Sequence, residues 1–276
     1  MKLHVQNEYG RLEKVLMASS EGFYLHPPIN AAQKYWYSHN PPAPGKLVGQ
    51  QKRFAEVLEE HGVEIIWAEK QDNCPNQINT RDIAFVAGDT LVVCRMKEEI
   101  RKDEIKGIKS LLDSVETPVI KAASGIIEGG DVVIDNGVIY AGISSRSDYD
   151  GVGWLEKNFS DKFLIKPVEL STGLLHLDVV FNVVDSNTAI VYEEGIKNIK
   201  TLSSAYELIK VGRTEQENLA VNTITVEPGL IICESRNHLV AGKLRSMGSK
   251  VIPIDYSEFT KIGGSFRCST CPLVRQ

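Results

Sequence analysis

The sequence lacks the features typical of membrane, secreted and nucleic-acid-binding proteins. No window approaches the roughly 18 to 20 apolar residues of a membrane span, and the opening MKLHVQNEYG has no apolar core of signal-peptide length. Basic residues are scattered, and the formal net charge of -5 over 276 residues argues against a nucleic-acid partner. These absences predict a cytoplasmic protein without membrane or nucleic-acid partners.

Cysteine is scarce, and its arrangement argues against two common uses. The cysteines number five, an odd count, at positions 74, 94, 233, 268 and 271. This is not a disulfide framework and fits a reducing compartment. Cys268 and Cys271 form a CxxC, but a zinc site needs a second ligand pair, and the other cysteines stand alone without an HxxxH. We therefore expect no metal.

What the sequence does contain is a repeat of four hairpin-like segments. Each begins with an aspartate or asparagine, continues as an alternating apolar run, turns, and returns as a second β-branched run. The segments start near Asp82, Asp131, Asp178 and Asn222, so the starts lie 49, 47 and 44 residues apart. A period of this size indicates a stacked or radial repeat architecture.

Segments with helical spacing lie between most of the hairpins, and several are followed by another short apolar run. The expected helices are RFAEVLEEHG, DEIKGIKSLLDS, VGWLEKNF, IKTLSSAYELIK and HLVAGKLRSMG. The unit is therefore strand, strand, helix, strand, which differs from an all-strand propeller blade. KVLMASS near the start and SFRCSTCPLVR at the end would share one unit, closing a ring of about five units over residues 1–276.

Residues 22–45 break this pattern. They hold five of the eleven prolines and five aromatic residues with no clear period. Loops of this length are usually binding loops or lids when they are ordered. Two interpretations stand: a lid over a site, or a loop that packs its aromatic side chains on the outside of the ring.

The CxxC lies in the expected strand SFRCSTCPL. Successive strand residues point to opposite faces, so a separation of three places the sulfurs of Cys268 and Cys271 on different sides of the sheet. One would face the ring centre and the other the helices. Gly263-Gly264 just before them permits close backbone approach. A buried, inert cysteine is the common alternative.

Ionisable residues stand where the hairpins begin. His176 and Asp178 are two apart in an expected strand and share a face, although a satisfied core histidine is the alternative for His176 alone. Glu128 and Asp82 add carboxylates at equivalent places, so a ring would bring all four to Cys268. This acidic site suits a planar guanidinium better than a compact ammonium. The bound cation would stabilise the cysteine as a thiolate.

Five segments, taken in order, resemble the motifs of the guanidino-group-modifying, or pentein, superfamily. They are NTRD, EGGDVV, GISSR, HLDVVFN and GGSFRCSTCPLVR. The superfamily contains arginine deiminases, dimethylarginine dimethylaminohydrolases and amidinotransferases, and the resemblance covers nearly the whole chain. It implies a pentein α/β-propeller of about five strand-strand-helix-strand units around a pseudo-fivefold axis.

The resemblance implies a catalytic set and a covalent mechanism. Cys268 is similar to the family nucleophile, His176 to the general acid/base, and Glu128 to the carboxylate that orients the histidine. The thiolate would attack the guanidinium carbon, and His176 would protonate the departing amine and then activate water. No metal or organic cofactor is needed.

The resemblance also implies a set of substrate-binding residues. Asp82 and Asp178 are similar to the pair that binds the guanidinium nitrogens. Arg146 in GISSR matches the arginine that binds the substrate α-carboxylate, and Arg101 matches a second one, with Arg95 as its substitute. For these last two, a solvated charge at a helix start is the alternative.

The implied activity is hydrolysis of arginine or a close derivative such as methylarginine, giving citrulline and ammonia or an amine. Asp178 matches deiminases and amidinotransferases, the chain length and GISSR look most like dimethylarginine hydrolases, and FRCSTCP resembles amidinotransferases. Transfer of the amidino group to an amine acceptor is one alternative, and a non-catalytic arginine-binding module is another. The expected partner is a small guanidino compound, and a homo-oligomer is left open.

Overall fold

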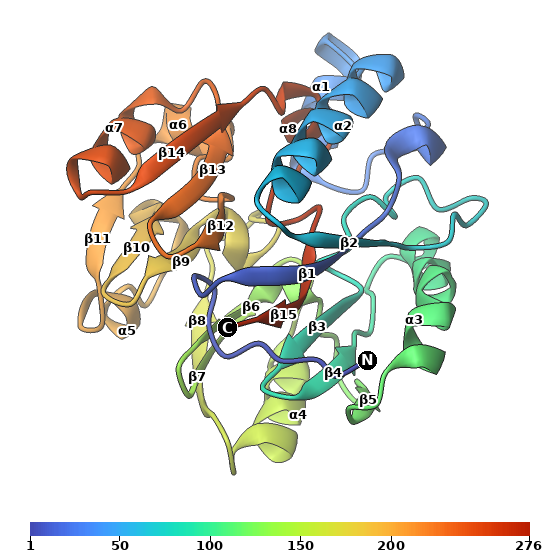
Figure 1. Cartoon of the computed structure of the whole chain (residues 1–276), viewed down its shortest axis with the longest axis vertical. Coiled ribbons are helices and arrows are strands. Elements are labelled where there is room, and N and C mark those ends of the chain that lie inside the picture. Colours follow the sequence, from blue (N-terminus) through green and yellow to red (C-terminus); the bar gives the residue numbers. More distant parts are fainter.

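The chain folds into five three-stranded sheets placed around a common centre, with helices on the outside (Figure 1). The structure, a computed structural model, describes all 276 residues. In each sheet the inner strand pairs antiparallel with the middle strand, and the outer strand runs parallel to the middle one. This is the predicted strand-strand-helix-strand unit, and it confirms the α/β-propeller.

The strands, from inner to outer in each sheet, follow the chain order except at the closure. The closing sheet has β15 (Cys271–Arg275), β1 (Leu12–Met17) and β2 (Glu64–Trp67). The second sheet has β3 (Ala84–Ala87), β4 (Thr90–Val93) and β5 (Val119–Lys121), and the third has β6 (Val132–Asp135), β7 (Val138–Ile143) and β8 (Leu164–Glu169). The fourth sheet has β9 (Phe181–Asp185), β10 (Thr188–Val191) and β11 (Glu207–Lys210), and the fifth has β12 (Ile224–Glu227), β13 (Leu230–Glu234) and β14 (Lys250–Ile254).

The helices are mostly crossovers between the middle and outer strands of one sheet. They are α1 (Ala31–His39) and α2 (Pro44–Glu60), α3 (Lys109–Ser114) after the 3-10 helix η2 (Glu99–Ile108), α4 (Tyr149–Phe159), α5 (Lys200–Ser203) and α7 (His238–Ser246), with α6 (Arg213–Glu217) and α8 (Ser257–Lys261) in the connections between sheets. No helix combines the length and the apolar character that a membrane crossing requires.

The hairpin between β6 and β7 shows how local sequence sets the unit. Asn136 and Gly137 both have positive φ, at 36° and 85°, as the two central residues of a tight hairpin turn require. Helix α4 then begins at an N-cap aspartate, Asp148, whose side chain accepts the Gly151 N–H. It buries Val152 and Phe159 against the sheet, and β8 returns parallel to β7.

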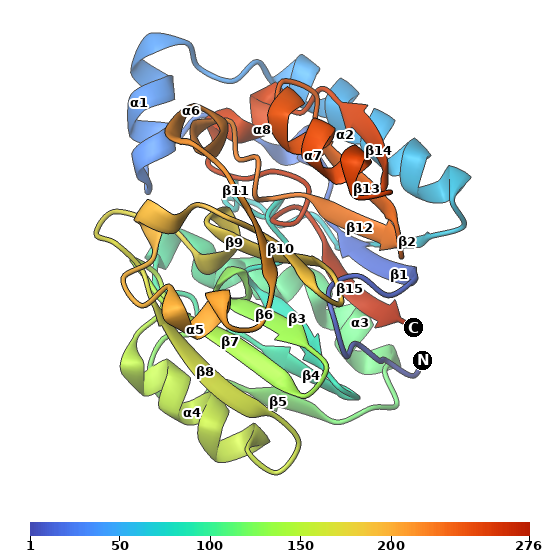
Figure 2. The ribbon, with the colours of Figure 1, turned by 90° about the vertical axis from the view of Figure 1, so that its left-hand side faces the viewer.

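The two ends of the chain close the ring. Strand β15 pairs antiparallel with β1, and His4 forms an isolated bridge with Val274 beside them. The first and last strands, blue and dark red, lie side by side in both views (Figures 1 and 2). The predicted closure is therefore confirmed, and it brings residues just before β15 to the centre.

Three predicted elements differ from the structure. IKTLSSAYELIK is helical only over α5, because Glu207–Lys210 pairs parallel with β10 as the outer strand of its sheet. DEIKGIKSLLDS is a 3-10 helix up to Ile108, where Gly107 lies so close to Glu69 that a Cβ would sit 2.5 Å from its carbonyl oxygen. Within residues 22–45, α1 replaces part of the expected loop, capped by the side chain of Asn30.

Candidate active site

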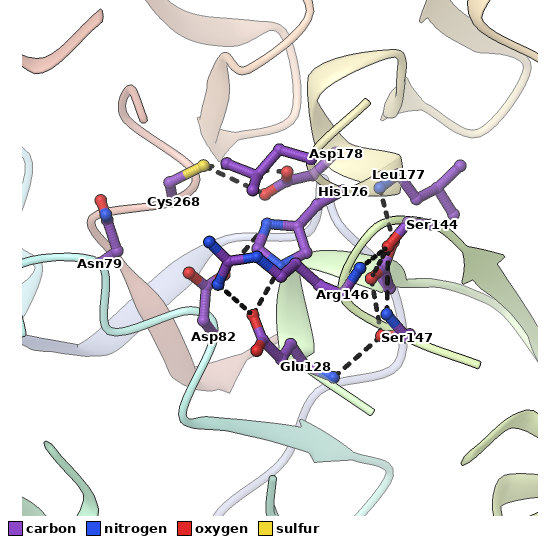
Figure 3. A network of polar contacts seen from close by, with 12 residues as sticks. Asn79, Asp82, Glu128, Ser144, Arg146, Ser147, His176, Leu177, Asp178 and Cys268 are labelled. Carbon is purple, nitrogen blue, oxygen red and sulfur yellow. Dashed lines mark hydrogen bonds and ion pairs between the residues drawn. The ribbon is translucent and has the colours of Figure 1, made fainter. Parts of the chain in front are cut away.

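Each of the five units contributes a polar side chain to the centre from the turn just before its inner strand. These residues are Asp82 before β3, Glu128 before β6, His176 and Asp178 before β9, Asn222 before β12 and Cys268 before β15. All are buried. Figure 3 shows five of them, Asp82, Glu128, His176, Asp178 and Cys268, pointing toward one another.

Two strand assignments from the sequence are wrong here. The strand expected over SFRCSTCPL begins only at Cys271, and Cys268 lies in a tight turn closed by the Ser269 N–H to Ser265 carbonyl bond of 3.0 Å. His176 is likewise the N-cap of the 3-10 turn η4 (Leu177–Val179), before β9. Strand pairing therefore begins only after the turns that hold these two side chains.

His176 and Glu128 form a buried ion pair in the site. His176 Nε2 lies 2.8 Å from Glu128 Oε2, and the backbone N–H of Lys97 donates to Oε1 at 2.9 Å. Burial by itself would lower the pKa of His176, but Asp82, Asp131 and Glu128 together raise it to about 9. Burial by itself would raise the pKa of Glu128, but the His176 contact lowers it to about 2. At neutral pH the pair is an imidazolium and a carboxylate.

The other nitrogen of His176 has no hydrogen-bond partner among the protein's own groups. Its Nδ1 lies 3.7 Å from Asp82 Oδ1, and neither buried atom has a hydrogen-bond partner. Gly130 borders the space between these two atoms, because a Cβ there would sit 2.8 Å from both Nδ1 and Oδ1. Buried polar atoms are normally satisfied, so two facing orphans mark a place for a polar ligand.

Cys268 lies beside a second carboxylate. Its Sγ is 3.5 Å from Asp178 Oδ2 and 3.8 Å from Oδ1, and the Asn222 Nδ2 donates to the sulfur at 3.1 Å. Burial, followed by the charges of Asp178 and Asp82, raises the pKa of the thiol well above its usual range. Without a bound cation, Cys268 is therefore a neutral thiol at neutral pH.

The second cysteine of the CxxC does not reach the site. Cys271 Sγ lies 3.2 Å from the carbonyl oxygen of Ala84, and the residue packs in a hydrophobic cluster with Phe85 and Leu273. The two sulfurs therefore occupy different environments, as expected. The cause is a turn followed by a strand, because Cys268 precedes the strand that contains Cys271.

The two site aspartates are each held by a buried arginine. Arg101 Nη1 contacts Asp82 Oδ2 at 2.6 Å, and Arg267 Nη1 contacts Asp178 Oδ2 at 3.0 Å. Arg267 in turn donates to Glu8 Oε1 at 2.9 Å. In each aspartate, Oδ2 is therefore bound to an arginine and Oδ1 is not.

The candidate arginines for a substrate carboxylate are placed differently from one another. Arg146 Nη1 has no hydrogen-bond partner and lies 3.6 Å from Glu128 Oε2, while its Nη2 donates to the carbonyl of Ile29 at 2.8 Å. Arg101 is fully engaged by Asp82 and by the Glu104 carboxylate at 2.9 Å. Arg95 is exposed.

The segment of residues 22–45 lies against the site. Besides Ile29, its Gln33 donates to Asn76 Oδ1 at 2.8 Å, and Asn76 Nδ2 contacts His26 Nε2 at 3.0 Å. Tyr35, on the outer face of this segment, is exposed. One side of the segment therefore contacts the site, through Ile29 and Gln33. Movement as a lid stays a prediction.

Sequence reasoning missed several residues of the centre. Asn222 stands at a hairpin start, and this place in the repeat is the sequence signal for its position at the centre. Asp131, also at a hairpin start, accepts the Ser144 and Ser147 hydroxyls at 2.7 Å and so ties GISSR to the His176 turn. Glu8 has no sequence signal, and Arg267 lies in the GGSFRCSTCPLVR motif without an indicated partner, because only the closed ring brings the two together.

The carboxylates and the histidine also resemble a metal site in outline. Ligand atoms of Asp82, Glu128 and His176 lie within 4.8 Å of one another. However, Glu128 Oε2 already contacts His176, and the Arg101 guanidinium lies against Asp82. These contacts already occupy lone pairs that a metal ion would need as ligands, whereas a planar guanidinium can donate to the carboxylate oxygens that remain.

Comparisons with known proteins point to one superfamily. The sequence model of the family described as N,N dimethylarginine dimethylhydrolase, eukaryotic, matches residues 22–275. The Bacillus subtilis protein YkgA is 36% identical over 272 residues, covering 98% of this chain and 94% of that protein. A Listeria monocytogenes arginine deiminase is 30% identical over 74% of this chain, which spans 62% of the deiminase.

Solved structures share the fold. SxtG, an amidinotransferase from Microseira wollei, aligns with a TM-score of 0.85 at 18% identity, over 99% of this chain and 97% of its own. The N-terminal domain of ArgZ, a cyanobacterial arginine dihydrolase, aligns with a TM-score of 0.81 at 20% identity, over 93% and 96%. With the fold and the family match in agreement, the chain belongs to the guanidino-group-modifying pentein superfamily, in the N,N dimethylarginine dimethylhydrolase family.

Proposed function

We propose that the protein is a cysteine-dependent hydrolase of the guanidinium group of arginine or a close derivative such as methylarginine, releasing citrulline and ammonia or an amine. One observation carries this proposal. The Cys268 thiol, the carboxylate of Asp178 and the facing orphan atoms of His176 and Asp82 converge in one buried site. A guanidinium is planar, positive and donates in several directions, which suits the carboxylate oxygens of Asp82 and Asp178.

The positive charge of the substrate would offset the carboxylate charges that disfavour ionisation of the Cys268 thiol. Asp178 and Asp82 supply two carboxylates, each with an oxygen not bound to an arginine, and a guanidinium between them would cancel their effect on Cys268. Binding would therefore lower the pKa of the thiol and produce the nucleophile where it is used. Arg146, with its unpartnered Nη1, would bind the substrate carboxylate. Arg101, whose guanidinium is already bound by Asp82 and Glu104, would hold Asp82 in position instead of binding the substrate carboxylate.

The first chemical step forms a bond from sulfur to the guanidinium carbon. The Cys268 thiolate attacks, and the tetrahedral adduct collapses by breaking a C–N bond as the imidazolium of His176 gives its proton to the leaving ammonia or amine. A thiouronium-type group remains on the sulfur. Glu128 holds the ring through Nε2, so Nδ1 is the nitrogen that faces the reaction.

The second step returns the cysteine. His176, now neutral, takes a proton from water as the water oxygen attacks the thiouronium carbon. The C–S bond then breaks, releasing the ureido product and the thiolate; the hydroxyl proton of the adduct passes to solvent, and His176 stays protonated. In an amidinotransferase, an acceptor amine replaces this water. Two fold relatives, SxtG and the inosamine-phosphate amidinotransferase StrB1 of Streptomyces griseus, are named as amidinotransferases, which keeps transfer as the second candidate.

A product assay tests the proposal. We expect incubation with arginine or methylarginine to yield citrulline with ammonia or an amine, and no ornithine, whether or not glycine and other amines are present. Ornithine that forms only with an added amine would assign amidino transfer. Binding of arginine by calorimetry without any product would assign the non-catalytic module and contradict the proposed hydrolase.

The raised pKa of Cys268 predicts an unusual pH dependence of thiol reactivity. A raised pKa means less thiolate at any given pH, so alkylation of the free protein by neutral chloroacetamide should rise about tenfold per pH unit and reach no plateau below pH 9. Chloroacetamidine, a cation of guanidinium-like shape, should react faster at the same pH. Peptide mass spectrometry measures labelling at Cys268. A plateau near neutral pH, or equal rates for the two reagents, would contradict the acidic-site argument.

A further inference from the structure

Asn222 contacts the Cys268 residue with both ends of its amide. Its Oδ1 accepts the Cys268 backbone N–H at 3.1 Å, and its Nδ2 lies 3.1 Å from Cys268 Sγ. Nδ2 also donates to the backbone carbonyl of Asp178 at 3.1 Å. The side chain is fully buried, so water does not compete for these bonds.

The orientation of this amide follows from its neighbours. A backbone N–H only donates and a carbonyl oxygen only accepts. Cys268 N–H therefore requires the oxygen of Asn222, and the Asp178 carbonyl requires the nitrogen. A flipped amide would oppose donor to donor and acceptor to acceptor. The group facing the sulfur is thus an N–H donor.

The strongest influences on the sulfur of Cys268 disfavour the thiolate, so an N–H donor beside the sulfur matters for its ionisation. Two carboxylates, those of Asp178 and Asp82, oppose a thiolate, and burial opposes it further. Two groups favour it: a backbone hydrogen bond from Ser265, and the charge of Arg267, which is shared with Asp178 and with Glu8. His176 contributes a positive ring across the site, held by Glu128. A neutral amide that donates to sulfur adds stabilisation without attracting a carboxylate.

We propose that Asn222 is a catalytic residue whose Nδ2–H donates to the Cys268 thiolate. This inference rests on the proposed function for the step in which the thiolate attacks. Asn222 stands in the turn before β12, the position from which the other four units supply Asp82, Glu128, His176 with Asp178, and Cys268. The fifth unit thereby contributes to the same chemistry as the other four.

The test compares Asn222→Ala and Asn222→Asp with a matched control. Alanine removes both the donor and the acceptor. An ionised aspartate keeps an acceptor for the Cys268 N–H but cannot donate to sulfur. Asn182→Ala is the control, because Asn182 is buried and its Nδ2 donates to the Val221 and Thr223 carbonyls on either side of Asn222, at 3.1 and 3.0 Å.

The readout is alkylation of Cys268 by chloroacetamide between pH 7 and 10.5, well below each variant's melting temperature. We expect Asn222→Ala to react about 3- to 10-fold more slowly at pH 8.5, because the lost bond reduces the thiolate fraction while higher intrinsic nucleophilicity offsets part of that loss. Asn222→Asp should be at least as slow. Asn182→Ala should melt earlier but keep the wild-type rate and pH profile.

A wild-type alkylation rate in Asn222→Ala or in Asn222→Asp would reject the donor role. A wild-type rate in Asn222→Asp would leave Asn222 only as the acceptor of the Cys268 backbone N–H. Alkylation needs no substrate, so the two proposals can fail separately. Slow alkylation in the variants of a protein that turns over no guanidino compound would reject the proposed function and, with it, a catalytic role, but would leave the donation from Asn222 to the Cys268 thiolate standing.

Discussion

Replacing Cys268 by serine is expected to abolish turnover, lowering kcat by about 10⁴-fold or more. A serine hydroxyl is far less acidic than a thiol, and the carboxylates of Asp178 and Asp82 that already raise the thiol pKa would oppose an alkoxide even more strongly. The variant should still bind the substrate cation, because the aspartates remain. Ureido product formation measures turnover, and calorimetry with arginine measures binding.

The matched control is Cys271→Ser, three residues along the chain. Cys271 is fully buried in a hydrophobic cluster and contacts the Ala84 carbonyl, away from the site. We expect a lower melting temperature with most of the turnover retained, since a hydroxyl can donate to the same carbonyl. Activity that survives in Cys268→Ser and disappears in Cys271→Ser would reverse the assignment of the nucleophile.

Gly130→Ala is expected to lower kcat/KM on the order of 100-fold, although the added group is only a methyl. A Cβ at Gly130 would sit 2.8 Å from His176 Cγ and Nδ1 and from Asp82 Oδ1, closer than such atoms approach one another. The ring or the carboxylate must move, and the methyl fills the position between the two orphan atoms. Steady-state kinetics with the substrate found in the product assay measures the effect.

The control for Gly130→Ala is Gly153→Ala. Gly153 lies in α4, and a Cβ there would meet nothing within 4 Å. Alanine favours a helix over glycine, so this variant should keep full activity and equal or higher stability. Wild-type kcat/KM in Gly130→Ala would show that the space between His176 and Asp82 is not where the substrate reacts.

Much of the fold was predictable because each unit repeats a local pattern. Alternating apolar runs around turns such as Asn136-Gly137 specify hairpins, and the period between them specifies how many there are. The sequence predicts a helix over the whole 199–210 segment, because its end from Ala205 to Lys210 has helical spacing as well as apolar residues. Glu207–Lys210 is instead a strand because it pairs parallel with β10, and such pairing depends on residues that are distant in the sequence.

The five candidate residues of the centre were also predictable, since they occupy equivalent places in the repeat and match known motifs. Their local conformation was not. His176 and Cys268 were expected in strands, yet both lie in turns, where side-chain direction depends on the contacts of each turn. Arg101 was expected to face a substrate carboxylate, and its contact with Asp82 came only with the packing of η2.

The sequence by itself therefore determined the repeating unit, its approximate number and the types of group that meet at the centre, because these depend on local periodicity and on motifs. Only the tertiary structure decided which atoms face one another. Glu8 and Arg267 are 259 residues apart and meet because β15 closes the ring beside β1. The amide of Asn222 reaches Cys268 for the same reason. Such contacts arise from ring closure, which no local pattern encodes.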